Sequence, residues 1–279
     1  LIVHTGPEFY EGTLEDFQVM TEIVDISGLA SANVLYTVDG GSFNSLTPDS
    51  SSGNMYYFTI PMQAAGVNVD YWITATDNAA NVDTVGIFQY ISGTHLIFDN
   101  AVVDFVYQYL ANQSVAVRLT LPAGSQADLV SALIRNYTDI NRPNDTMMVH
   151  IWSDAGGLPG ADLVTPFEVY PEATLTNTSP MTRVDLRPYS AQLSGLTGDV
   201  YVGFSVPAGA LNGIWLTGTS PGAFNRTFTN AGSGWVAAAQ DHHFRGIIGD
   251  TTLVGITAGT ELIPEEFALY QNYPNPFNP

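Results

Sequence analysis

The stretch VNVDYWITATD, residues 67–77, alternates apolar and polar side chains along its length. Successive side chains of a β-strand point to opposite faces, so this pattern predicts a strand with one buried and one exposed face. Similar strand patterns precede and follow it, at residues 16–25, 32–38, 55–60 and 84–90. Short strands at this spacing, without helical periodicity, predict a Greek-key β-sandwich over residues 1–93.

Residues 94–250 continue the β pattern with longer strands and richer loops. Residues 128–137 fit either a short helix or a strand, and β-branched Val130 and Ile134 favour a strand. Clearer strand patterns occupy residues 115–121, 147–152, 200–204 and 213–216. We therefore expect an all-β fold with two β-sandwich domains in tandem and an extended C-terminal tail.

The charge balance is strongly acidic, with 27 Asp and Glu against 7 basic residues and a net charge of −20. All the basic residues are Arg. Such a surface repels nucleic acid and anionic membranes, so we exclude both as partners. The chain has no Cys, which excludes disulfides and thiolate metal sites.

Neither a signal peptide nor a membrane helix is expected. Residues 1–5 have no basic region and are far too short for a signal peptide, so we expect either a leader already removed or a piece of a longer chain. No run approaches the roughly 20 apolar residues of a membrane helix, so we expect no membrane insertion.

The first sandwich resembles a known module. The stretch YWITATDNAAN, residues 71–81, resembles the Y-x-I-x-A-x-D-x-x-G-N strand and turn of bacterial extracellular immunoglobulin-like or fibronectin-like modules. The stretch LYTVDGG, residues 35–41, resembles their upstream hairpin, and glycine suits the positive φ of tight hairpin turns. Ala80 departs from the pattern, where such modules usually have glycine. The resemblance implies an immunoglobulin/fibronectin-like fold for residues 1–93 and says nothing of a ligand.

The second sandwich resembles a jelly-roll-like domain of secreted multidomain bacterial proteins. The resemblance rests on VHIWSDAGGLPG at residues 149–160, GDVYVGF at residues 198–204, and Trp235 followed by DHHFRG at residues 241–246. It covers residues 94–250 and concerns architecture. It implies either sugar binding or a spacing and display role, because relatives of this shape do one or the other.

The tail carries the most specific motif. After an expected linker at residues 251–266, the stretch FALYQNYPNPFNP at residues 267–279 resembles the opening of the type IX secretion sorting domain. The matching residues are Leu269, Gln271, Asn272, Tyr273, Pro274, Asn275, Pro276 and Phe277. The prolines forbid a helix and predict an extended path, which an ordinary Pro-rich linker would share. The resemblance implies export by that machinery to the outside or outer surface of a Gram-negative bacterium.

Two groups of Asp and Asn are candidate calcium sites, because Ca²⁺ prefers closely spaced oxygen ligands. The first contains Asp77, Asn78, Asn81 and Asp83, and the weaker second contains Asp99, Asn100 and Asp104. The alternative is a turn in which Asp and Asn bond their own backbone. Calcium is the only cofactor expected. His242 and His243 are neighbours on a predicted strand, point to opposite faces and do not predict a zinc site.

No catalytic constellation stands out. Glu168 and Glu172 are the only Glu of the second domain and belong to a predicted Pro-rich loop, and no facing carboxylate pair is singled out for glycoside hydrolysis. No Ser–His–acid set is singled out for nucleophilic catalysis. We therefore expect no enzyme. Four aromatic residues suit either sugar stacking or the sandwich core, with the core favoured: Trp152, Tyr201, Trp215 and Trp235.

Three Asp-Thr triplets resemble the O-glycosylation pattern of bacteria that use type IX export. They place candidate glycosylation at Thr84, Thr146 and Thr251. The triplet is short, so chance matches are expected.

These observations favour a non-catalytic extracellular surface module for binding, spacing or display. The candidate partners are the export machinery, glycans and further copies of the chain. One alternative is a structural subunit of an extracellular filament, sheath or surface layer, because extended chain ends can add a strand to a neighbouring sheet. A second alternative is a fragment of a secreted hydrolase.

Overall fold

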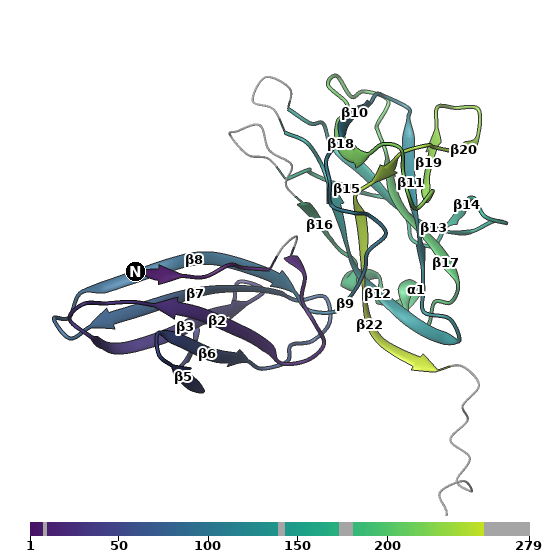
Figure 1. Ribbon diagram of the computed structural model, residues 1–279. Helices are drawn as coiled ribbons and strands as arrows, with labels where there is room; N and C mark the ends of the chain where they lie inside the picture. The colour runs from purple at the N-terminus through teal and green to yellow at the C-terminus, as the bar shows by residue number, and fades with distance from the viewer. Residues whose placement is uncertain (8–9, 139–142, 173–180, 254–279) are drawn as a thin grey trace, which may run out of the picture.

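A computed structural model describes residues 1–7, 10–138, 143–172 and 181–253, and within these it confirms the all-β fold (Figure 1). The described helical segments are short: the 3₁₀ turn Arg187–Tyr189 and α1 (Ser190–Leu193). Residues 251–253 continue the last strand, whereas a linker was expected from residue 251. The rest of that predicted linker and the sorting motif lie outside the described residues.

The first sandwich consists of two antiparallel four-stranded sheets. One has the order β1 (Ile2–Val3), β2 (Phe17–Ile23), β6 (Met55–Ile60), β5 (Ser50–Ser52), and the other has β4 (Asn44–Leu46), β3 (Leu29–Val38), β7 (Asn68–Asp77), β8 (Val82–Ile91). The alternation that predicted β7 sets its burial, since Val69, Tyr71 and Ile73 are buried in the core and their neighbours are half-buried. The predicted hairpin joins β3 to β4, and Asp39 and Gly40 both have the positive φ of a type I′ turn.

The second sandwich is larger and has three sheets. The first runs β14 (Pro159–Asp162), β13 (Met147–Asp154), β17 (Asp199–Ser205), β11 (Ser114–Thr120), β19 (Thr227–Asn230), β20 (Trp235–Ala237), with β15 (Phe167–Val169) also on β13. The second runs β16 (Met181–Asp185), β12 (Ser125–Arg135), β22 (Phe244–Leu253), β9 (Thr94–Leu96), and the third runs β10 (Phe105–Tyr109), β18 (Ile214–Thr219), β21 (Asp241–His242). The stretch at 128–137 is thus mostly strand, and Glu168 lies in β15 rather than in a loop.

The outer face of the β16-β12-β22-β9 sheet contacts the first sandwich. Ile91 of the first sandwich is buried against Leu133, Met181 and Ile247 of the second, and we call these four residues the junction cluster. Tyr10 packs against the same cluster. The two sandwiches therefore share a small apolar interface in addition to their separate cores.

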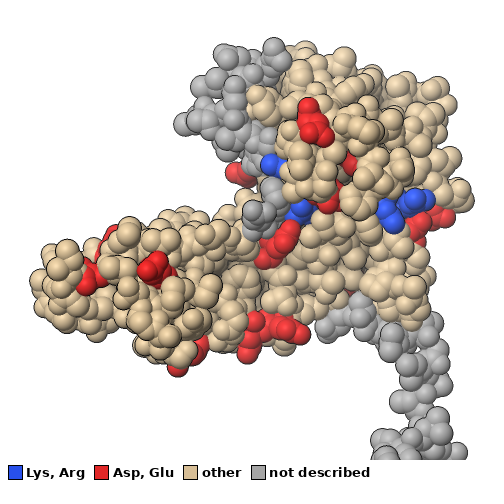
Figure 2. Space-filling view, in the orientation of Figure 1, with Lys and Arg blue, Asp and Glu red and all other residues tan. Residues whose placement is uncertain are grey.

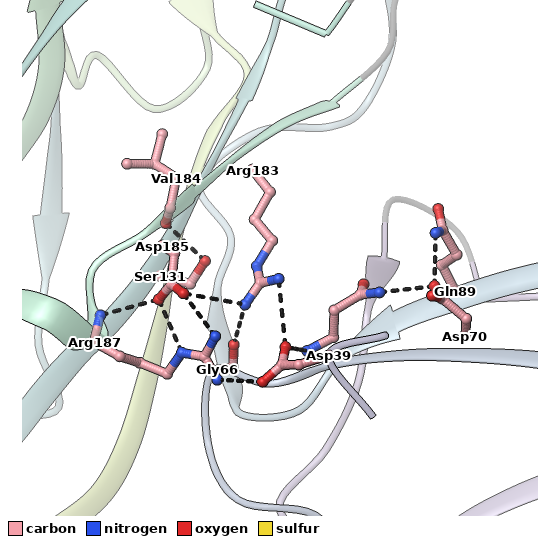
Figure 3. A network of polar contacts seen from close by, with 10 residues as sticks. Asp39, Gly66, Asp70, Gln89, Ser131, Arg183, Val184, Asp185 and Arg187 are labelled. Atoms are coloured by element: carbon pink, nitrogen blue, oxygen red, sulfur yellow. Dashed lines mark hydrogen bonds and ion pairs between the residues drawn. The ribbon is translucent and has the colours of Figure 1, made fainter. Parts of the chain in front are cut away.

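Ion pairs and hydrogen bonds also connect the two sandwiches at this interface. Residues 1–93 contain no Lys or Arg, so the basic groups visible in Figure 2 belong to the second sandwich. Arg187 forms a 2.7 Å ion pair with Asp39, at the tip of the β3–β4 hairpin, and a 2.6 Å ion pair with Asp185 (Figure 3). Arg183 donates a hydrogen bond to the Gly66 carbonyl. The predicted hairpin turn therefore also docks the first sandwich on the second.

Ala80 supports a stability prediction. Its φ of +65° lies in the left-handed region, which explains why the related modules have glycine at this position. We expect Ala80→Gly to raise the free energy of unfolding by up to about 1 kcal/mol, because the strain exceeds the added chain entropy. Urea denaturation at pH 7 measures the change. An unchanged or lower midpoint would contradict the strain argument.

Candidate functional site

A cavity of about 310 Å³ lies between the two sandwiches, and we call it the junction cleft. Its volume is at the small end of the range for ligand pockets, about 300–1,000 Å³. The first sandwich contributes Tyr10, Asn68, Gln89 and Ile91, and the second contributes Tyr170, Glu172, Met181, Thr182 and Arg183. The cleft therefore exists only where both sandwiches meet.

One wall of the cleft is a pair of amides fixed by a carboxylate. Asn68 and Asp70 project from the same face of β7, and Gln89 lies opposite Asp70 in the register with β8. The Asn68 Nδ2 and the Gln89 Nε2 each donate a 2.7 Å hydrogen bond to the Asp70 Oδ1. Because the amide nitrogens face Asp70, the two side-chain carbonyl oxygens remain as oriented acceptors.

The opposite wall comes from β16 and the chain before it. The Thr182 hydroxyl accepts a 2.7 Å hydrogen bond from the Glu172 N–H, and Asn136 Nδ2 donates to the Glu172 carbonyl at 2.8 Å. These contacts fix the backbone of Glu172 beside the cleft. Arg183 adds a donor, and burial lowers the pKa of its guanidinium although it stays charged.

The floor and the two tyrosines make the cleft amphipathic. Ile91 and Met181, both buried in the junction cluster, form an apolar floor. Burial raises the pKa of Tyr10, and the carboxylates of Glu172 and Asp70 raise it further, so its hydroxyl stays protonated as a donor. Tyr170 is 76% exposed, which leaves its ring available at the mouth of the cleft.

The electrostatics of the cleft disfavour anions. The carboxylates of Asp39, Asp70 and Asp185 lie beside the guanidinium groups of Arg183 and Arg187. Glu172, which lines the cleft, adds a further carboxylate. Hydrogen bonds and the charges of these arginines outweigh burial and lower the pKa of Asp39 and Asp185, so both stay ionised. The surroundings of the cleft therefore have an excess of negative charge, within a chain of net charge −20.

The first predicted calcium group forms a hydrogen-bonded turn. The Asp77 Oδ1 accepts 2.8 Å hydrogen bonds from the N–H groups of Ala79 and Asn81, and its Oδ2 accepts a 2.7 Å bond from the Asn81 side chain. Hydrogen bonds from the Asn81 side chain and then its backbone lower the pKa of Asp77. Asn78 donates to the Ser27 carbonyl, and Asp83 accepts from the Thr84 N–H. Within the described part of the chain, no three His, Asp or Glu side chains are placed to share a metal ion.

Calcium binding is directly testable. We expect chelation by EGTA to leave the melting temperature unchanged, because N–H donors already occupy both carboxylate oxygens of Asp77. Differential scanning fluorimetry measures the melting temperature after EGTA treatment and after Ca²⁺ or Mg²⁺ is added back at roughly millimolar levels. This concentration suits the test because Ca²⁺ sites in extracellular modules bind at about 10⁻⁴–10⁻³ M. A melting temperature that falls with EGTA and recovers only with Ca²⁺ would show that the loop rearranges around the ion.

The second predicted calcium group is built into ion pairs and turns. The Asp99 carboxylate accepts hydrogen bonds of 2.8 and 2.9 Å from Arg245. The Asn100 Oδ1 accepts from the Thr219 hydroxyl, and Asp104 accepts from the Ser220 N–H. Arg245 therefore occupies the position expected for a cation at Asp99.

The predicted aromatic set divides between two places. Trp152 and Tyr201 are buried on the outer face of the β13-β17-β11-β19 sheet together with Phe228, while Trp235 packs on Trp152 at 5.0 Å. Trp152 and Tyr201 are thus buried, as the core interpretation expected, but in a separate cluster, because Ile151 and Val202 take the positions between the sheets. Trp152 is only 5% exposed, so its ring is not an open stacking platform. Trp215 lies apart, on β18.

The glycosylation candidates differ in accessibility. Thr84 is exposed on the edge strand β8, whereas Thr146 is half-buried just before β13. Thr251 belongs to β22, and its side chain lies outside the described residues. His242 and His243 are both buried.

Sequence reasoning missed the junction cleft. Asn68, Gln89, Glu172 and Arg183 share no local motif, and only the packing of the two sandwiches brings them together. A weak signal was present, since Asn68 and Asp70 occupy the polar, half-buried positions of the most regular strand. Among the described residues, no helix has the length and apolar character needed to cross a membrane.

Comparison with known proteins identifies no family for the chain. No family model and no curated protein matches the chain. Similar solved structures include an uncharacterised Listeria monocytogenes protein crystallised with glucose, magnesium and calcium, at 13% identity and a TM-score of 0.27 over 82% of this chain and 20% of that one. An α-L-rhamnosidase from Aspergillus terreus matches at 9% identity and a TM-score of 0.28, over 88% of this chain and 29% of that one. A carbohydrate-binding module of the β-sandwich superfamily matches at 12% identity and a TM-score of 0.24, over 77% of this chain and 97% of that one. The chain spans less than a third of the length of the first two proteins.

Proposed function

We propose that the chain is a non-catalytic extracellular surface module that binds a neutral glycan in the junction cleft. The observation that carries the proposal is the lining of the cleft: an apolar floor of Ile91 and Met181 beneath the fixed amides of Asn68 and Gln89. A sugar ring has apolar C–H faces and a rim of hydroxyls that both donate and accept hydrogen bonds. The cleft supplies matching surfaces of both kinds.

The charges of the cleft support a neutral ligand and a non-catalytic role. Asp70 accepts two amide donors, and Asp39 and Asp185 are paired with Arg187. Among the described residues that line the cleft, Glu172 alone has a carboxylate. Glycoside hydrolysis ordinarily needs two carboxylates across the scissile bond, so a single free one fits binding without turnover.

Export to the cell surface is the second part of the proposal. Its support is the resemblance of residues 267–279 to the type IX sorting motif, which places the export machinery among the partners. An extracellular setting would expose the cleft to polysaccharides. Detection of the native protein in the medium or on the outer surface, and its loss there after deletion of residues 267–279, tests this part separately from binding.

A glycan array followed by titration calorimetry tests the cleft. We expect Asn68→Ala/Gln89→Ala to weaken binding of a neutral oligosaccharide at least tenfold, since two lost hydrogen bonds remove about 1 kcal/mol each or more. The matched control is Gln18→Ala, because Gln18 lies on β2 and bonds Thr59 away from the cleft. Equal binding by both variants would refute the site. Release of new reducing ends from the bound glycan would refute the non-catalytic role.

A further inference from the structure

A second cavity, of about 190 Å³, opens at an edge of the second sandwich. Aromatic rings dominate its lining: Phe105, Tyr107 and Tyr109 of β10 and His242 of β21. Thr229 and Gln240 lie on the opposite side, from the region of β19 and β20. We call this cavity the aromatic pocket, and it shares no residue with the junction cleft.

Strand register explains why the rings gather. Phe105, Tyr107 and Tyr109 are spaced two apart on β10 and so share one face of the strand. Phe105 lies opposite Gly218, which in turn lies opposite His242. Gly218 has no side chain, and a Cβ there would come within 2.6 Å of the Phe105 ring. The gap over Gly218 therefore lets the Phe105 and His242 rings approach to 5.6 Å.

The polar atoms at the inner end of the pocket bond one another. The His242 Nδ1 lies 3.0 Å from the Thr217 carbonyl, which can only accept, so Nδ1 holds the proton. The His242 Nε2 therefore accepts from the Tyr109 hydroxyl at 2.8 Å. Burial lowers the pKa of His242 to about 4, so the ring is neutral at pH 7. A sugar hydroxyl entering this end would find no free partner among these atoms.

We propose that the aromatic pocket binds an organic cation, of the class of quaternary ammonium or methylated amine groups. Such cations need no hydrogen bonds and are attracted to the negative faces of aromatic rings. The neutral His242 ring adds no positive charge that would repel a bound cation. The net charge of −20 attracts cations and repels anions over longer distances.

Choline and its neutral isostere 3,3-dimethyl-1-butanol distinguish a cation site from a merely apolar one. In ligand-observed NMR titrations of the whole chain, we expect choline to bind about tenfold more tightly than the isostere, in line with cation–π attraction. Tyr107 is 47% exposed, so its substitution should leave the fold intact. We expect Tyr107→Leu to weaken choline binding roughly fivefold or more and Tyr107→Phe to retain it, because only the first removes a ring.

The matched control is Tyr57→Leu, a half-buried tyrosine on β6 of the first sandwich. It keeps the net charge and should leave choline binding unchanged. Equal affinity for choline and the isostere, no binding of choline, or an equal loss in Tyr57→Leu would each overturn the proposal. Failure here leaves the glycan titrations of the junction cleft unaffected, since the two cavities are separate.

Discussion

Arg245→Met should lower the free energy of unfolding by about 3–5 kcal/mol, the usual cost of removing one partner from a buried ion pair. The Arg245 side chain is 2% exposed and that of its partner Asp99 is 1% exposed. Arg245 also forms a 2.7 Å ion pair with Glu11 of the first sandwich. Methionine retains much of the buried volume but leaves the Asp99 carboxylate without its cation.

The effect should operate through Asp99. Burial by itself raises the pKa of Asp99, but the hydrogen bonds and charge of Arg245 outweigh it and lower the pKa below its usual value. Loss of the arginine leaves burial opposed by weaker contacts such as the hydrogen bond from the Ala101 N–H, so the charged carboxylate destabilises the folded state at pH 7. The double variant Arg245→Met/Asp99→Asn should therefore recover part of the lost stability. Urea denaturation at pH 7 measures all three proteins.

A matched control separates burial from pairing. Arg118 pairs with Asp199 at 3.7 Å, and both side chains are 28% exposed. Arg118→Met should cost no more than about 1 kcal/mol, as exposed ion pairs usually do. Similar losses of stability for the two arginine variants would contradict the argument that burial makes the Arg245–Asp99 ion pair important.

The sequence predicted the strands well because alternation is a local property. Residues 67–77 and the turn at Asp39 appear in the structure much as their pattern indicated. The placement of the aromatic residues could not be predicted, and the reason is physical. When both faces of a strand are covered, as around Trp152 and Tyr201, alternation separates two apolar faces but does not tell which one meets the core.

The two cavities could not be predicted locally. Arg183 and Asn68 meet only because the outer face of one sheet docks on the first sandwich, and docking depends on long-range complementarity. One missed signal lay in the sequence itself: Arg245 interrupts the apolar end of a strand in a chain with only seven basic residues. A charged residue within such a stretch predicts a buried partner.

Acidification from pH 7 to pH 5 should destabilise the protein through its buried histidines. Burial lowers the pKa of both His242 and His243 from 6.5 to about 4. The unfolded chain therefore binds protons that the folded chain does not, and stability falls as the pH drops below about 6.5, until both rings are protonated in the folded state. For an isolated histidine with these values, the loss at pH 5 is about 2 kcal/mol.

The window between pH 7 and pH 5 isolates histidine because most carboxylates titrate lower, near about pH 4. Burial also lowers the pKa of His4 and His95, so they contribute with the same sign. His243→Gln should therefore reduce the pH dependence of the urea midpoint without abolishing it. A wild-type midpoint that stays constant from pH 7 to pH 5 would mean that water reaches His242 and His243, and the neutral ring assigned to the aromatic pocket would then have to be abandoned.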